Sequence, residues 1–123
     1  MGNIEELILQ KATTPRVAEC ALLVFNYAKK VGELASYFLM SDIRSISKPK
    51  QYQSEECNEA MSMLVEFGVF EMHYEYRDDV ITEEDYLACI EEKCDPITGY
   101  YSENWQEEAG RFYSCKLKKQ TQE

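Results

Sequence analysis

Four side chains of this sequence could together supply the ligands of a zinc ion: Cys89, Cys94, Cys115 and His73. Thiolates and imidazole nitrogens hold zinc in tetrahedral sites, commonly with two cysteines in a close Cys-x-x-Cys pair, because one tight turn must aim both sulfurs at the ion. Cys89 and Cys94 are separated by four residues instead of two. The spacing therefore favours reduced thiols packed in a core and predicts no metal or other cofactor, with a zinc site as the alternative.

Nucleophilic catalysis would depend on His73, because it is the only histidine in the chain. No cysteine or serine in the sequence is placed beside it by a recognisable motif. The five glycines stand far apart, at 2, 32, 68, 99 and 110, so they cannot form a phosphate-cradling loop. We therefore predict that the protein is not an enzyme.

Charge is strongly segregated along the chain. Residues 1–53 carry seven basic and five acidic side chains, residues 54–110 carry two basic and seventeen acidic, and residues 111–123 carry four basic and one acidic, giving net charges of +2, −15 and +3. An acidic block repels phosphate, so nucleic acid is an unlikely partner and a protein with a basic surface is the expected one.

Length and composition predict one soluble domain over residues 1–123. The chain is 45% apolar, which is enough for one core, and it has no long apolar stretch that would span a membrane. Five cysteines form an odd set without a secretory signal at the start, which favours a reducing compartment. We expect a cytoplasmic protein that does not contact membranes.

Helices are predicted from capping residues and from three- and four-residue apolar spacing. An N-terminal helix is expected over 1–12, with its regular part at 4–12, and a central helix starts at Thr14-Pro15 and ends at Gly32. A second helix is expected over 33–40, followed by an exposed loop over 43–53. The third begins at Ser54 and ends at Gly68.

After Gly68 the apolar period changes to two, which predicts a strand. Phe70, Met72, Tyr74 and Tyr76 would share one face, with His73 on the wet face. A second strand is expected over 111–119, where Lys116 and Lys118 could pair with Glu71 and Glu75 of the first. Residues 78–110 between the strands form a helical insertion, with one helix from Thr82 to about Lys93 and a short one, capped by Ser102, that carries Trp105.

The stretch EAMSMLVEFGVFEMHYEY resembles the end of a winged helix-turn-helix domain, in which the third helix closes at a glycine and the first wing strand follows. The resemblance covers residues 15–77 and 111–119. It implies an α+β, mainly helical fold: a three-helix core with a two-stranded hairpin whose wing carries the 78–110 insertion. A loop of about a dozen residues before the third helix and the helical insertion depart from the family pattern.

Winged helices that bind DNA place basic or amide side chains on the exposed face of the third helix. That face is acidic or neutral in this sequence. We therefore expect a small adaptor or regulatory protein that acts through protein contacts, with a homodimer through the N-terminal helix as a further expectation. The alternatives are a DNA-mimic inhibitor of the viral type, which would occupy the basic cleft of a nuclease or other nucleic-acid-binding protein, and a winged-helix transcription regulator. The expected partner-binding residues are Glu55, Glu59, Glu66, Glu83, Glu84, Glu91, Glu92, Tyr101 and Trp105.

Overall fold

The computed structural model describes residues 3–47 and 50–118, which form an α+β fold. The sequence predicts one core, whereas the chain groups into two compact units. The first unit holds the residues up to 71 together with those from 113 onward, and the second unit holds residues 72–112. The predicted insertion, 78–110, thus lies inside a unit of its own.

Two helices at the start of the first unit begin at the residues that the sequence predicts. In α1 (Ile4–Lys11) the side chain of Asn3 accepts a hydrogen bond of 2.9 Å from the Glu5 amide. In α2 (Pro15–Val31) the Thr14 hydroxyl accepts from the Val17 amide at 3.2 Å, and Pro15 occupies the first helical position. Side-chain caps satisfy amides that have no partner inside the helix, so these two starts could be predicted locally.

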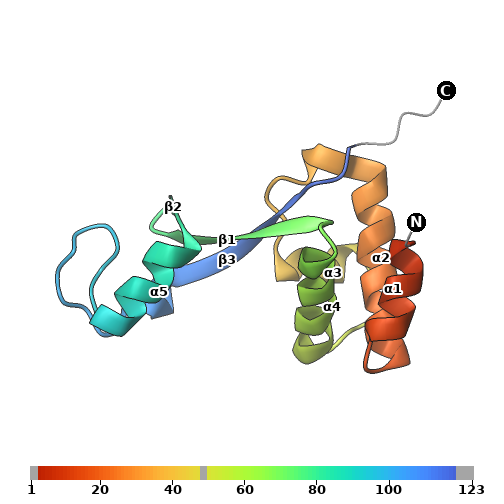
Figure 1. Ribbon diagram of the computed structural model, residues 1–123, viewed down its shortest axis with the longest axis horizontal. Coiled ribbons are helices and arrows are strands. Elements are labelled where there is room, and N and C mark those ends of the chain that lie inside the picture. The colour runs from red at the N-terminus through yellow and green to blue at the C-terminus, as the bar shows by residue number, and fades with distance from the viewer. Residues whose placement is uncertain (1–2, 48–49, 119–123) are drawn as a thin grey trace. The chain divides into compact units, whose positions relative to one another are not determined.

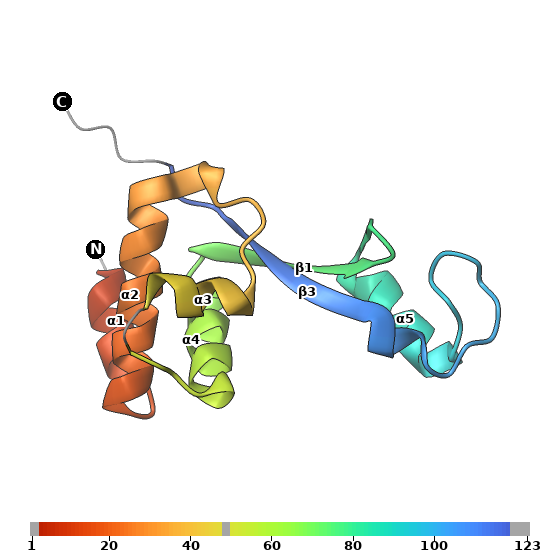
Figure 2. The same cartoon turned by 180° about the vertical axis from the view of Figure 1, so that it is seen from behind.

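The core of the first unit forms around α2, which lies between α1 and α4 (Ser54–Glu66) in the views of Figure 1 and Figure 2. The third helix was predicted from Ser54 to Gly68; it ends two residues earlier, at Glu66, and Gln53 and not Ser54 is its cap residue. Gly68 follows it with φ +80°, a conformation that glycine adopts without strain. The residues of α2 that are buried are Val17, Ala18, Cys20, Ala21, Val24, Phe25 and Ala28.

The predicted helix over 33–40 is wrong, and the predicted loop over 43–53 is wrong for residues 43–46, which are helical. A short 3₁₀ turn (Gly32–Leu34) ends early, and Phe38 forms an antiparallel bridge with Tyr113 through two backbone hydrogen bonds of 2.7 and 2.8 Å. Helix α3 (Met40–Ile46) then begins where the Asp42 carboxylate accepts from the Leu39 amide at 2.8 Å. The connection to α4 is therefore 47–53, shorter than predicted, and residues 48 and 49 lie outside the described part of the chain.

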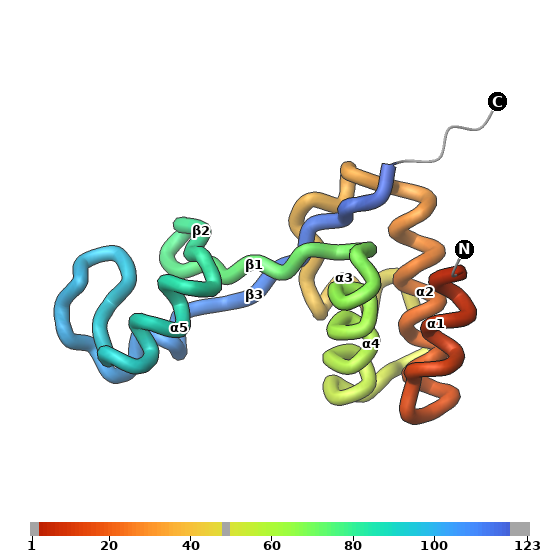
Figure 3. Tube along the Cα trace, viewed as in Figure 1, coloured from red at the N-terminus to blue at the C-terminus, as the bar shows by residue number. Residues whose placement is uncertain are grey.

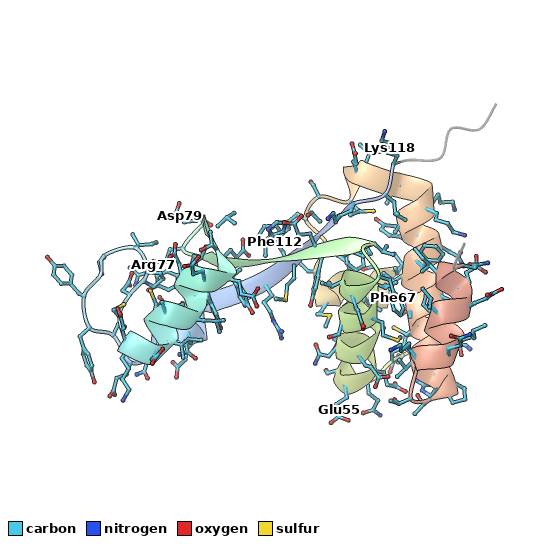
Figure 4. The ribbon with its side chains drawn as sticks, in the orientation of Figure 1. Glu55, Phe67, Arg77, Asp79, Phe112 and Lys118 are labelled. Carbon is cyan, nitrogen blue, oxygen red and sulfur yellow. The ribbon has the colours of Figure 1, made fainter. Side chains whose placement is uncertain are left out.

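The sheet has three strands in the order β2-β1-β3, where the sequence predicted two. They are β1 (Phe70–Tyr76), β2 (Asp79–Ile81) and β3 (Ala109–Cys115). A two-residue turn joins β1 to β2, with Arg77 at φ +48° and Asp78 at φ +69°, and Figure 4 labels Arg77 and Asp79 there. Two successive left-handed residues are the signature of the tight hairpin turn, which usually carries glycine or asparagine. Residues 77 and 78 are Arg and Asp, so the glycine or asparagine that would mark this turn in the sequence is absent, and β2 was not predicted.

The last strand begins and ends earlier than predicted. It stops at Cys115, and the amide of Lys116 bonds to the Val69 carbonyl at 2.8 Å. Lys116 and Lys118 therefore lie past the strand, which removes the predicted cross-strand pairing with Glu71 and Glu75. Residue 119 lies outside the described chain.

The second unit is built from α5 (Glu83–Glu92), the β1–β2 hairpin and a 3₁₀ turn (Trp105–Glu108). Thr82 caps α5 as predicted, accepting from the Asp85 amide at 3.1 Å, whereas Asn104 and not Ser102 precedes the 3₁₀ turn. Its core consists of Tyr76, Ile81 and Trp105 with partly buried aromatic neighbours.

Aromatic contacts hold this small core together. The rings of Tyr74 and Tyr86 stack with centroids 3.9 Å apart, and Trp105 meets Tyr76 and Tyr86 edge-on at 5.6 and 5.3 Å. Such pairs add about 0.5–1.5 kcal/mol each beyond the area they bury. His73 is partly buried and stacks on Phe112 with ring centroids 4.9 Å apart, so it is less exposed than the predicted wet face implies.

Candidate protein-docking site

A closed loop between α5 and the 3₁₀ turn carries the most exposed aromatic side chains of the second unit. We name residues 94–102 the aromatic loop; its course is visible in the tube of Figure 3. Its two ends pair through an antiparallel bridge between Cys94 and Tyr101, and the Ser102 amide bonds to the Lys93 carbonyl at 2.8 Å. The loop is therefore held at its base by backbone hydrogen bonds.

Asp95 fixes the interior of the aromatic loop. Its side chain is 7% exposed, and its Oδ1 accepts from the amides of Ile97 and Thr98 at 2.8 and 3.0 Å. Oδ2 accepts from the Tyr76 hydroxyl at 2.7 Å. These bonds, led by that from the Thr98 amide, hold the pKa of Asp95 below its ordinary value, because each favours the charged carboxylate.

Backbone hydrogen bonds also cross the aromatic loop. The Asp95 amide donates to the Tyr100 carbonyl and the Gly99 amide donates to the Asp95 carbonyl, both at 2.7 Å. Gly99 has φ +77°, which a residue with a side chain rarely adopts. The turn is thus fixed on both sides of Gly99, and the loop has one defined backbone course.

This fixed backbone presents apolar side chains to solvent. Ile97 is 47% exposed, Tyr100 is 77% exposed and Tyr101 is 71% exposed. Tyrosine is enriched at the centres of protein interfaces, where a rigid ring contributes contact area at a low entropy cost. The sequence predicts Tyr101 as a binding residue but not Ile97, whose position between two turn residues, Pro96 and Gly99, is a signal of exposure.

The unit that carries the aromatic loop is strongly acidic. Residues 72–112 hold three basic and twelve acidic side chains, a net charge of −9 out of the −10 of the whole chain. Glu91 and Glu92 precede the loop on α5 and are exposed; Glu103 follows it, accepts from the Tyr101 hydroxyl and lies 4.0 Å from the Lys93 ammonium. Glu83 and Glu84 are exposed in the first turn of α5.

The three glutamates predicted on the third helix belong to the first unit and differ among themselves. Glu55 and Glu66 are exposed, and Figure 4 shows Glu55 at the end of α4 opposite to Phe67. Glu59 is half-buried, and its carboxylate accepts from the amide of Thr13 at 3.0 Å and from the Thr13 hydroxyl at 2.8 Å. Glu59 therefore joins α4 to the α1–α2 connection, and its role in partner binding stays a prediction.

Trp105 was also predicted to bind a partner. It is 2% exposed, it packs on Tyr76 and Tyr86, and its indole N–H points to the Cys89 carbonyl at 3.4 Å. An indole this deeply buried has no surface to offer to another protein. The prediction for Trp105 is wrong because the second unit places its largest side chain in its core, beside Tyr76 and Ile81.

The thiols divide between the two units. Cys20, Cys57 and Cys115 are buried in the first unit, and Cys89 and Cys94 are partly buried in the second. Burial raises the pKa of Cys20 to about 12 and that of Cys89 to about 11. Among residues 3–47 and 50–118, no three histidine, cysteine or acidic side chains gather as metal ligands would.

Comparisons with known proteins returned nothing for this chain: no model of a protein family, no curated protein and no solved structure matches it. None of the helices in the described residues has the length and apolar character needed to cross a membrane.

Proposed function

We propose that this protein is a small non-enzymatic adaptor or regulatory protein that binds a partner with a basic surface through the aromatic loop and the carboxylates beside it. One observation supports the proposal: Tyr100 and Tyr101 are largely exposed, and they lie on a loop whose backbone Asp95 holds by hydrogen bonds. A loop that is ordered before binding loses little conformational entropy when a partner covers it.

The acidic side chains beside the aromatic loop should determine which partner binds, because they favour a basic surface. Glu91, Glu92 and Glu103 are exposed and lie within three residues of the aromatic loop in the chain. Complementary charge speeds encounter and excludes partners of like charge, while buried aromatic rings supply most of the affinity. A basic protein surface with an apolar recess for the tyrosines is the partner that fits.

Site-specific photocrosslinking tests the proposal. A benzophenone amino acid at Tyr100 should capture one discrete protein in cells, and the same group at Leu34, which is 73% exposed in the first unit, should not. Replacing Tyr101 by Ser should reduce capture from position 100. Equal and diffuse labelling from both positions would contradict a docking role for the aromatic loop.

A DNA-mimic inhibitor is the second candidate, and the concentration of acidic side chains in residues 72–112 favours it. Mimicry depends on carboxylates more than on rings. Exchange of Glu83, Glu84, Glu91 and Glu92 for Gln should then abolish capture of a nucleic-acid-binding protein, whereas Tyr100→Ser should leave it intact. If the protein is an adaptor, Tyr100→Ser should reduce capture more than the exchange of the four glutamates does.

A further inference from the structure

The C-terminal end of α5 forms a backbone motif that brings two cysteines together. The Cys94 amide donates to the Cys89 carbonyl at 3.1 Å, across the end of the helix. The Lys93 amide donates to the Ile90 carbonyl at 3.4 Å, and Lys93 has a left-handed φ of +54°. These two bonds around one left-handed residue define the Schellman motif, in which the side chains of the outer two residues frequently touch. In this helix the outer two residues are Cys89 and Cys94.

The same backbone bond places the two cysteines within reach of a disulfide. Standard covalent lengths, together with this bond, keep their Cα atoms within about 7 Å of each other. A disulfide spans Cα atoms that are about 4.4–6.8 Å apart. The two thiols also meet: burial, and then the adjacent Cys94 thiol, raise the pKa of Cys89 to about 11. No large movement of the backbone is therefore needed to join the sulfurs.

The two thiols differ in their surroundings. Cys89 packs against the core formed by Tyr76, Ile81 and Trp105. Cys94 lies at the start of the aromatic loop, and its Sγ donates to the carboxylate of the exposed Glu92 at 3.9 Å. A reagent in solution therefore meets Cys94 first, and Cys89 stands behind it.

A second thiol pair, in the first unit, provides a comparison within the chain. Cys20 and Cys57 also interact with each other, but they are 0% and 8% exposed. Buried thiols are inert, because a reagent reaches them only when the fold opens. Accessibility thus distinguishes the pair at the end of α5 from the pair between α2 and α4.

We propose that Cys89 and Cys94 form a reversible disulfide by exchange with a low-molecular-weight disulfide, RSSR. The Cys94 thiolate attacks one sulfur of RSSR, forms a mixed disulfide and releases RS⁻. The Cys89 thiolate then attacks the Cys94 sulfur, closes the protein disulfide and releases the second RS⁻. Two electrons pass from the protein to the reagent, and the two protons lost by the protein thiols convert both RS⁻ ions to RSH.

The disulfide would tie the last turn of α5 to the base of the aromatic loop. That base already contains the Cys94–Tyr101 bridge and the bond from the Ser102 amide to the Lys93 carbonyl. In a reducing compartment the five cysteines stay free, as they are in this structure, and the bond forms when the concentration of RSSR rises. This modification site stands whether or not the aromatic loop binds a partner.

Cystamine, a cationic disulfide suited to an acidic unit, tests the site on the full reduced chain. After the reaction is stopped with acid and the remaining thiols are alkylated, peptide mass mapping should find Cys89 joined to Cys94. A bond between Cys20 and Cys57 should form at least roughly tenfold more slowly, because it requires opening of the first unit. Excess dithiothreitol should restore the free thiols at positions 89 and 94.

Two serine variants test the order of the steps. In Cys89→Ser the second step is lost, so Cys94 should remain as a mixed disulfide with the probe. In Cys94→Ser the modification of Cys89 should be slower than that of Cys94 in the parent by roughly tenfold or more, because a thiol with a raised pKa supplies little thiolate. Cys115→Ser is the matched control: a serine hydroxyl can keep the bond that this thiol donates to the Ala28 carbonyl, and the reaction should be unchanged.

The parent protein alone can contradict the proposal. A mixed disulfide that persists at Cys94 would overturn it, because the two sulfurs would then not meet. Formation of the Cys89–Cys94 bond only in urea, or at the same rate as a Cys20–Cys57 bond, would overturn it as well. Circular dichroism confirms that each serine variant is folded, and if one is not, the mapping of the parent decides.

Discussion

The Tyr76 hydroxyl donates a hydrogen bond of 2.7 Å to the buried Asp95 carboxylate and thereby links the last residue of β1 to the base of the aromatic loop. The same carboxylate accepts from two amides of the loop. The exposed tyrosines therefore depend on a contact made in the core of the second unit.

Loss of this carboxylate should loosen the aromatic loop. In Asp95→Ala, the amides of Ile97 and Thr98 lose their acceptor, so their protection from hydrogen exchange should fall roughly tenfold or more. Tyr76→Phe is the matched control, since it removes one donor and keeps both amide bonds, and its effect on these amides should be smaller. Unchanged exchange in Asp95→Ala would show that the backbone bonds alone fix the loop.

Acid should destabilise the second unit through Asp95. Its pKa in the folded protein lies below the ordinary value of 3.8, because the hydrogen bonds favour the charged form. A carboxyl group with a lowered pKa stabilises the fold above the unfolded pKa, and this stabilisation is lost as the pH falls through the folded pKa. Trp105 emission in urea, measured from pH 6 to pH 2, should show a fall in stability below about pH 4. Asp95→Asn should flatten that fall; an identical acid profile in both proteins would assign it to other carboxylates.

Alkali should destabilise the first unit through Cys20. Burial raises the pKa of this thiol from 9.0 to about 12, so the folded state holds its proton more tightly than the unfolded state does. The resulting stabilisation is complete below pH 9 and is lost as the pH rises toward 12. Urea unfolding followed by helical circular dichroism should show a smaller loss between pH 8 and pH 11 in Cys20→Ala than in the parent. Parallel curves would exclude Cys20 as a source of the alkaline loss.

Charge reversal at Glu59 should lower the free energy of unfolding more than charge reversal at Glu55. Glu59→Lys removes the acceptor of the Thr13 amide and hydroxyl and should lower the free energy of unfolding by about 1–3 kcal/mol. Glu55→Lys changes an exposed side chain and should stay within about 0.5 kcal/mol, apart from a small helix-dipole effect. Urea titration of both variants measures the difference. Equal stabilities would mean that the Thr13 contact contributes nothing.

Substitutions of Trp105 and of Tyr101 should have opposite effects: the first should lower stability, and the second should reduce partner binding. Trp105→Ala leaves a cavity in the core of the second unit and should cost about 3–5 kcal/mol. Tyr101→Ser removes an exposed ring and should alter stability by about 0.5 kcal/mol or less while reducing capture of the partner. Thermal melting with the capture assay gives both quantities. A thermally stable Trp105→Ala would contradict the placement of the indole in this core.

Local signals predicted the helices that begin at their own caps, such as α1 at Asn3, α2 at Thr14 and α5 at Thr82. The segment 33–46 was assigned wrongly because its structure is decided by a distant one: Phe38 pairs with Tyr113, which no sequence window contains. Tertiary pairing of this kind overrides the local helix propensity of a segment. The α+β class is confirmed, and the winged-helix resemblance stays a prediction.

The candidate site was predicted in part for a related reason. Exposed Tyr101 and buried Trp105 are both aromatic residues in an acidic insertion, and the sequence does not state which of them the core takes. That choice follows from the positions of Tyr76 and Tyr86, which contact the indole. Glu59 could not be distinguished from Glu55 without the fold, since its partner Thr13 lies forty-six residues away.

The first unit is interrupted in the chain, and this has a consequence for synthesis on the ribosome. Three backbone pairings join its two segments: Ala35 with Cys115, Phe38 with Tyr113, and Val69 with Lys116. The second residue of each pair is translated after residues 72–112. Domains usually fold in the order in which they leave the ribosome. In the nascent chain the second unit is therefore the first to have all its residues, and the first unit can complete these backbone hydrogen bonds only after the segment that begins at residue 113 has been made.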